Sequence, residues 1–138
     1  MTKSGYINGV HLNNIYLLGR IPRNEVLKLM EESDVFVMIS KDETFGLVYL
    51  EAMSKGCIVI ASKNEGMDGI IEHGVNGYLC QAGNEEELVE VLREIRNLSA
   101  PKRKSIAANA IETVKKMTDK IVAEDYLNCV LGKNESEI

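Results

Sequence analysis

The 138-residue sequence lacks several features that would place it in a particular class of protein. No apolar run approaches the roughly 20 residues that a helix needs to cross a membrane, and residues 1–5 do not begin the apolar segment of a signal peptide. An excess of basic residues is also absent: the net charge of −5 argues against a general nucleic-acid binder. We therefore expect a cytoplasmic globular domain.

Cysteine and histidine, the usual ligands of structural zinc, are scarce as well. The three cysteines, Cys57, Cys80 and Cys129, form no Cys-x-x-Cys pair, and the two histidines, His11 and His73, lie far apart in the sequence. This pattern argues against a structural zinc site. Cys57 and Cys80 fall in strand-like apolar runs, so we interpret them as buried, unreactive thiols that suit a reducing cytosol.

The residues that are present indicate one domain over residues 1–132 and a tail at 133–138. Residues 1–14 are expected to form an irregular or weakly paired leader, and residues 70–74 a single helical turn. Apolar runs and helical periodicity predict strands near 15–18, 34–39, 57–61 and 78–80, and helices at 24–32 and 47–53 and from 84, 101 and 118 onward, with Asn24 and Asn84 as N-caps. This alternation predicts an α/β fold, with a Rossmann-like, largely parallel sheet flanked by helices and a helical C-terminal segment.

The strand-to-helix turn after residue 39 is the most informative part of the sequence. Such turns lie at the carboxyl ends of parallel strands, where ligands usually bind. Glu43 falls in the turn, and Glu51 follows eight positions later in the helix. Thr44 can cap that helix, and Gly46 leaves room for an anion at its N-terminus. A phosphate at the helix amides with carboxylates on either side suits a sugar nucleotide, although Glu43 could equally be a solvated loop residue and Glu51 an ordinary surface residue.

Residues 43–53, together with Gly56 and residues 59–62, resemble the signature of retaining glycosyltransferases of family 4, which have the GT-B architecture. The resemblance covers roughly residues 15–131 and implies a role for each matching residue. Glu43 would contact hydroxyls of the donor sugar, and Glu51 would hold the ribose diol of the nucleotide. The amides of Phe45, Gly46 and Leu47 would approach the diphosphate or the sugar. The resemblance also places Gly66 near the donor sugar.

The sequence departs from the family pattern in the loop at 65–69. Glu65 replaces the first glycine of the usual Gly-Gly pair, and Gly69 replaces the glutamate that often follows it. Asp68 is interpreted as a helix cap, with a ligand role as the alternative. Arg20 and Arg23 lie in a different loop from the Arg and Lys that neutralise the diphosphate in the family.

The resemblance implies a donor-binding domain without the N-terminal domain that binds the acceptor. The chain would therefore be a fragment of a glycosyltransferase that uses a nucleotide-diphosphate sugar, most simply a UDP-sugar, and whose full-length form could associate with a membrane. The sequence offers no convincing catalytic residue, and the absence of Asp-x-Asp agrees with a reaction that needs no metal. We also expect no cofactor.

Two other functions stay open. The fragment could be a non-catalytic module that binds nucleotide weakly or serves only in assembly. It could also be a different Rossmann-like nucleotide binder, although no Gly-x-Gly-x-x-Gly motif supports dinucleotide binding.

The expected strand order of a doubly wound sheet bears on assembly. In the order 3-2-1-4-5-6, strands near 15–18 and 35–39 would be separated by two missing strands. We expect the first strand to shift and pair with the second, or two chains to pair edge to edge as a homo-oligomer.

Overall fold

The computed structural model describes residues 4–7, 10–39 and 47–130, with side-chain surroundings for residues 13–39 and 47–118. The elements run in the order β1 (Ser4–Ile7), β2 (Val10–Tyr16), α1 (Arg23–Glu32), β3 (Val35–Val37), α2 (Leu47–Ser54), β4 (Ile58–Ser62), β5 (Tyr78–Cys80), α3 (Glu85–Arg96) and α4 (Ala100–Val130). The predicted α/β class is confirmed.

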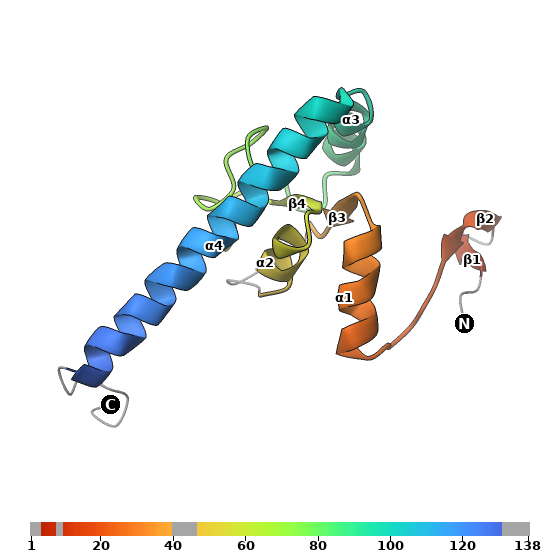
Figure 1. Ribbon diagram of the computed structural model, residues 1–138. Helices are drawn as coiled ribbons and strands as arrows, with labels where there is room; N and C mark the ends of the chain where they lie inside the picture. Colours follow the sequence, from red (N-terminus) through yellow and green to blue (C-terminus); the bar gives the residue numbers. More distant parts are fainter. Residues whose placement is uncertain (1–3, 8–9, 40–46, 131–138) are drawn as a thin grey trace.

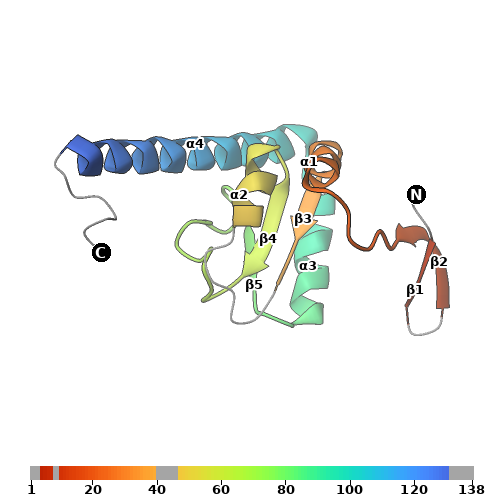
Figure 2. The same cartoon turned by 90° about the horizontal axis from the view of Figure 1, so that it is seen from below.

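The central sheet is parallel and has the order β3-β4-β5 among the described residues. Val35 pairs with Ile58 at one end, and Ser62 pairs with Cys80 at the other. Helices α1 and α2 lie on one side of this sheet and α3 lies on the other (Figure 2). Helix α4 crosses the end of the sheet, with Ile106 in the core on the α3 side and Ala110 in the core on the α1 and α2 side. The arrangement brings the carboxyl ends of β3 and β4 to the same edge, beside the N-terminus of α2.

Strand β4 is apolar because both of its faces are covered. Val59 and Ala61 pack into the core under α1, α2 and α4, while Ile58 and Ile60 pack into the core under α3. All five residues of β4 are buried. A central parallel strand has no solvated face, and its sequence is therefore a continuous apolar run instead of an alternating pattern.

The first 16 residues differ from the sequence-based expectation. Strands β1 and β2 form an antiparallel hairpin in which Ile7 pairs with Val10, where we expected an irregular leader and a strand near 15–18. This hairpin stands apart from the main sheet, connected by the segment at 17–22 (Figure 1). The expected pairing of the first strand with β3 is therefore wrong within the described chain. Pairing β1 with β2 closes a shorter loop than pairing the first strand with β3 would. The hairpin therefore costs less chain entropy.

Two helical boundaries also differ. Helix α1 begins at Arg23 with Pro22 as its N-cap, so Asn24 is inside the helix. Pro22 has an extended backbone, and its carbonyl accepts hydrogen bonds from the amides of Glu25 and Val26 at 3.0 and 3.1 Å. Helix α4 continues through Thr118, where we expected a new helix, because residues 102–130 contain no glycine or proline to stop it.

Residues 70–74 form turns and isolated bridges instead of a helical turn. The buried Asn76 side chain stabilises this conformation. Its Oδ1 accepts from the amide of Glu72 at 2.7 Å, and its Nδ2 donates to the carbonyl of Ile70 at 3.1 Å and to Oγ1 of Thr113 at 2.9 Å. A side chain that satisfies backbone groups in this way competes with helical hydrogen bonding.

Candidate functional site

The candidate site lies at the carboxyl edge of β3 and β4, where α2 begins and the loop at 63–69 starts. Three of the expected site residues, Glu43, Phe45 and Gly46, lie outside the described residues, as does the expected cap Thr44. The other three are described. Leu47 is the first residue of α2, Glu51 lies one turn further along, and Gly66 is half-buried in the loop after β4.

Helix α2 is held firmly against the sheet. Tyr49, Leu50, Ala52 and Met53 are buried, and the hydroxyl of Tyr49 donates a hydrogen bond to the carbonyl of Met38 at 3.0 Å. The ring of Tyr49 also packs edge-on against Phe36, with the ring centroids 6.1 Å apart. These contacts leave Leu47, which is 67% exposed, on the outer side of the helix.

Helix α2 ends just before a glycine, Gly56. Gly56 has a φ of +85°, a left-handed conformation that glycine adopts without strain, and its amide donates to the carbonyl of Met53 at 3.0 Å. The helix is therefore confined to two turns, and its N-terminus is directed toward the carboxyl edge of the sheet.

Glu51 forms an ion pair that the sequence did not reveal. Its Oε2 atom is paired with Nη2 of Arg23, the first residue of α1. The side chain of Glu51 is 21% exposed and that of Arg23 is 74% exposed, yet Oε2 of Glu51 is itself buried. One signal was present in the sequence: an arginine near the start of a helix is unfavourable with respect to the helix dipole, which suggests a partner elsewhere.

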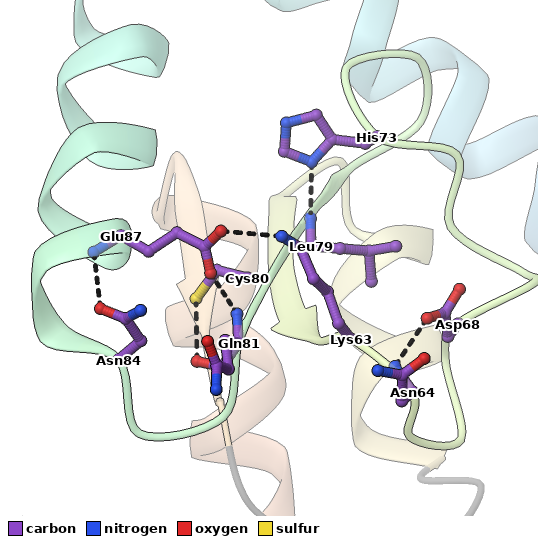
Figure 3. A network of polar contacts seen from close by, with 9 residues as sticks. All are labelled: Lys63, Asn64, Asp68, His73, Leu79, Cys80, Gln81, Asn84 and Glu87. Carbon is purple, nitrogen blue, oxygen red and sulfur yellow. Dashed lines mark hydrogen bonds and ion pairs between the residues drawn. The ribbon is translucent and has the colours of Figure 1, made fainter.

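The loop at 63–69 is held by a polar network that links it to α3 (Figure 3). Lys63 Nζ lies 2.7 Å from Oε2 of Glu87, and the other carboxylate oxygen of Glu87 accepts a hydrogen bond from the amide of Gln81. Asn84 caps α3 as expected, because its Oδ1 accepts from the amide of Glu87 at 3.0 Å. Glu87 therefore connects the loop after β4, the end of β5 and the start of α3.

This network shifts two pKa values. The Gln81 amide, followed by the hydrogen bond from Lys63, lowers the pKa of the Glu87 carboxyl below its ordinary value. The hydrogen bond to Glu87 raises the pKa of Lys63 above its ordinary value. Both groups are therefore charged at neutral pH.

Asp68 stabilises the loop from within. Its Oδ2 accepts a hydrogen bond from the amide of Asn64 at 2.6 Å, and Asn64 has a φ of +60°. The expectation that Asp68 caps a helix is wrong, because the residues after it are not helical. Asparagine tolerates the left-handed conformation better than most residues, and the bond to Asp68 holds it there.

A polar cavity of about 410 Å³ lies between this loop and α3. Lys63, Asp68, His73, Glu87 and Glu94 are among its lining residues. His73 Nδ1 accepts a hydrogen bond from the amide of Leu79 at 3.0 Å. In the part of the chain that the structure describes, no group of three or more His, Cys, Asp or Glu side chains is arranged to hold a metal ion.

The two described cysteines have the character expected of them. Cys57 and Cys80 are buried free thiols, and burial raises the pKa of each. Cys57 Sγ donates to the carbonyl of Met30 at 3.0 Å. Neither thiol has the exposed, electropositive surroundings of a reactive cysteine.

Comparison with known proteins identifies the family. A family model described as "Glycosyl transferases group 1" matches residues 7–113. The chain is 31% identical over 108 residues to N-acetyl-alpha-D-glucosaminyl L-malate synthase of Bacillus anthracis, covering 72% of this chain and 28% of that protein. The chain therefore spans less than a third of that relative's length. None of the helices in the described part of the chain combines the length and the apolar character of a membrane span.

Solved structures agree with this result. The C-terminal domain of a glycosyl transferase group 1 family protein from Francisella tularensis superposes with a TM-score of 0.65 at 32% identity, covering 72% of this chain and 51% of that one. HepE of Anabaena, in a complex with UDP-glucose, superposes with a TM-score of 0.68 at 30% identity, covering 78% of this chain and 29% of that one. The chain belongs to the glycosyl transferases group 1 family and has the fold of a GT-B C-terminal domain.

Proposed function

We propose that this domain binds the nucleotide-diphosphate sugar donor of a retaining glycosyltransferase, and that the donor is a UDP-sugar. The observation that carries the proposal is the position of Glu51. It lies on the short helix α2 at the carboxyl edge of the parallel strands, in a chain that belongs to a glycosyltransferase family. A carboxylate at such an edge is well placed to accept hydrogen bonds from the hydroxyls of a ribose.

In this proposal the N-terminus of α2 receives the diphosphate. The first amides of a helix have no partner within the helix, and the helix dipole favours an anion beside them. The amides of Phe45, Gly46 and Leu47 would serve this purpose and would assist departure of the diphosphate. Leu47 is the one of these three that the structure describes, and its exposed side chain is consistent with an open helix start.

The donor sugar would lie between Glu43 and Gly66. The Lys63–Glu87 ion pair and the Asn64–Asp68 hydrogen bond hold the loop that carries Gly66 in a defined conformation. A loop fixed before the ligand arrives loses less conformational entropy on binding. UDP is favoured as the nucleotide because HepE, a 30% identical protein, was solved in a complex with UDP-glucose.

Titration calorimetry with UDP tests the nucleotide half of the proposal. Glu51→Ala should weaken binding by the value of a charge-assisted hydrogen bond, on the order of 1.5–3 kcal/mol, and Glu51→Gln by less because its amide still reaches the ribose. Glu86→Ala is the matched control, since Glu86 is an exposed helical glutamate on α3, on the other side of the sheet. Equal affinity for the wild type and both Glu51 variants would reject the role of Glu51, and no UDP binding by the wild type would reject the proposal for this chain.

Glu43→Ala tests the sugar half. The variant should bind UDP with nearly the wild-type affinity. The amount by which UDP-glucose binds more tightly than UDP should become much smaller. Equal loss of both affinities would show that Glu43 contacts the nucleotide or supports the fold instead.

A second candidate applies to the 138 residues by themselves: nucleotide binding without sugar transfer. The match to the Bacillus anthracis relative spans 28% of that protein's length, and sugar transfer by a whole protein is a separate question from nucleotide binding by these residues. The acceptor would bind to a separate N-terminal domain. We propose a cytoplasmic location for either candidate, because the buried free thiols Cys57 and Cys80 would stay reduced there. Sugar-transfer assays on this chain and on a longer version separate the two candidates.

A further inference from the structure

We propose that Arg23 is a positioning residue for Glu51: it fixes one oxygen of the carboxylate, offsets its charge and leaves the second oxygen for a ligand hydroxyl. The inference rests on the proposed function as far as the ligand is concerned. The ion pair itself is a feature of the described structure and joins two helices whose starts are 24 residues apart in the sequence.

The first argument concerns Arg23. It is the first residue of α1, where the helix dipole disfavours a positive charge, and the N-cap Pro22 makes no side-chain hydrogen bond to offset this. A cation at this position is therefore locally unfavourable unless it has a nearby acid. Glu25 lies in the same first turn, but the acid that is paired with Arg23 is Glu51, on the neighbouring helix α2.

The second argument concerns Glu51. Its Oε2 is buried and, within the described residues, accepts no hydrogen bond with good geometry, so Arg23 supplies its charge partner. A buried carboxylate oxygen without a cation is costly. The side chain as a whole is still 21% exposed, so the exposed area belongs to the remainder of the side chain. One end of the carboxylate is thus held while the side chain keeps access to solvent.

The third argument concerns the ligand. A nucleoside diphosphate carries several negative charges, and a free glutamate beside it would repel them. With Arg23 paired to it, Glu51 can accept a hydrogen bond from a ribose hydroxyl with little net repulsion of the diphosphate. The side chain of Arg23 is 74% exposed, and its guanidinium has five N–H donors, more than one carboxylate can use.

A simpler role would be a surface ion pair that joins α1 to α2. Exposed pairs of this kind contribute little to stability, and they leave ligand affinity unchanged. The two roles therefore differ in whether Arg23 affects binding and in whether that effect passes through Glu51.

The first experiment needs no nucleotide. The guanidinium N–H signals of Arg23, those on Nη2 included, are followed by ¹⁵N NMR in the wild type, in Glu51→Gln and in Glu25→Gln, which removes a different acid from the first turn of the same helix. We expect the signals to move in Glu51→Gln and to stay nearly unchanged in Glu25→Gln. Unchanged signals in Glu51→Gln would overturn the proposal.

The second experiment measures UDP and uridine affinity for Arg23→Gln, Glu51→Gln and the double variant. Arg23→Gln should lower the affinity for UDP about tenfold, a typical effect for a charge-assisted contact. It should lower the affinity for uridine by a smaller factor. In the Glu51→Gln background the same change should have at most a threefold effect, because Arg23 acts through Glu51. Arg23→Lys should recover part of the UDP affinity, and Lys28→Gln, which removes a charge from the exposed side of the same helix, should match the wild type.

The outcomes separate the two proposals. If UDP binds but Arg23→Gln changes the UDP affinity by the same factor in the wild type and in the Glu51→Gln background, Arg23 is not a positioning residue. If UDP does not bind to the wild type, the proposed function fails for this chain, and the NMR measurement still decides whether Arg23 fixes Glu51.

Discussion

The contact that fixes α2 in the candidate site can be tested by removing one oxygen atom. Tyr49 is 1% exposed, and its hydroxyl donates to the carbonyl of Met38 at 3.0 Å. Tyr49→Phe keeps the ring and its edge-on contact with Phe36 but leaves the Met38 carbonyl without this donor. A buried group left without its partner costs about 1–3 kcal/mol.

We therefore expect Tyr49→Phe to lower the free energy of unfolding by about 1–2 kcal/mol, since relaxation around the carbonyl recovers part of the cost. Urea unfolding measures this as a lower midpoint at an unchanged slope. Tyr16→Phe is the matched control, because Tyr16 is 54% exposed and loses only a solvated hydroxyl. If both variants unfold at the wild-type midpoint, the bond to Met38 does not hold α2 in place and the argument is wrong.

Three further predictions follow from the fold. Gly77→Ala should destabilise the protein by about 1–3 kcal/mol, because a Cβ there would lie 3.1 Å from the carbonyl oxygen of Val59 and 3.2 Å from Cγ2 of Ile71; thermal unfolding at the wild-type midpoint would contradict this. Glu87→Gln should be less stable than the wild type at neutral pH. The pKa of Glu87 is lowered in the folded state, so its contribution is present above the ordinary value of 4.5 and is lost as pH falls through the lower folded value. The stability difference between the two proteins should therefore shrink on acidification below about pH 4.5, and a difference that grows would refute the assigned network. Finally, β3 pairs only with β4 among the described residues, so we predict that two chains associate through the free edge of β3. Light scattering should show a dimer, and a monomer at all concentrations would reject edge pairing.

Local features could be predicted from the sequence because each depends on neighbouring residues. The apolar run of β4, the stop at Gly56 and the Asn84 cap are set by backbone preferences and by hydrogen bonds over a few positions. The family resemblance likewise rests on a short continuous segment, and the family match over residues 7–113 agrees with it. The assigned roles of Glu43, Phe45, Gly46, Leu47, Glu51 and Gly66 stay predictions.

Tertiary structure decided the features that join distant segments. Pairing of Arg23 with Glu51 depends on how α1 and α2 pack, and pairing of Lys63 with Glu87 depends on where α3 lies relative to the loop after β4. Strands β1 and β2 pair with each other. Closing this short loop costs less chain entropy than closing the longer loop to β3. Sequence patterns describe the backbone preference and the buried face of one element at a time. They do not contain the relative placement of two elements, and that placement determines which charges meet.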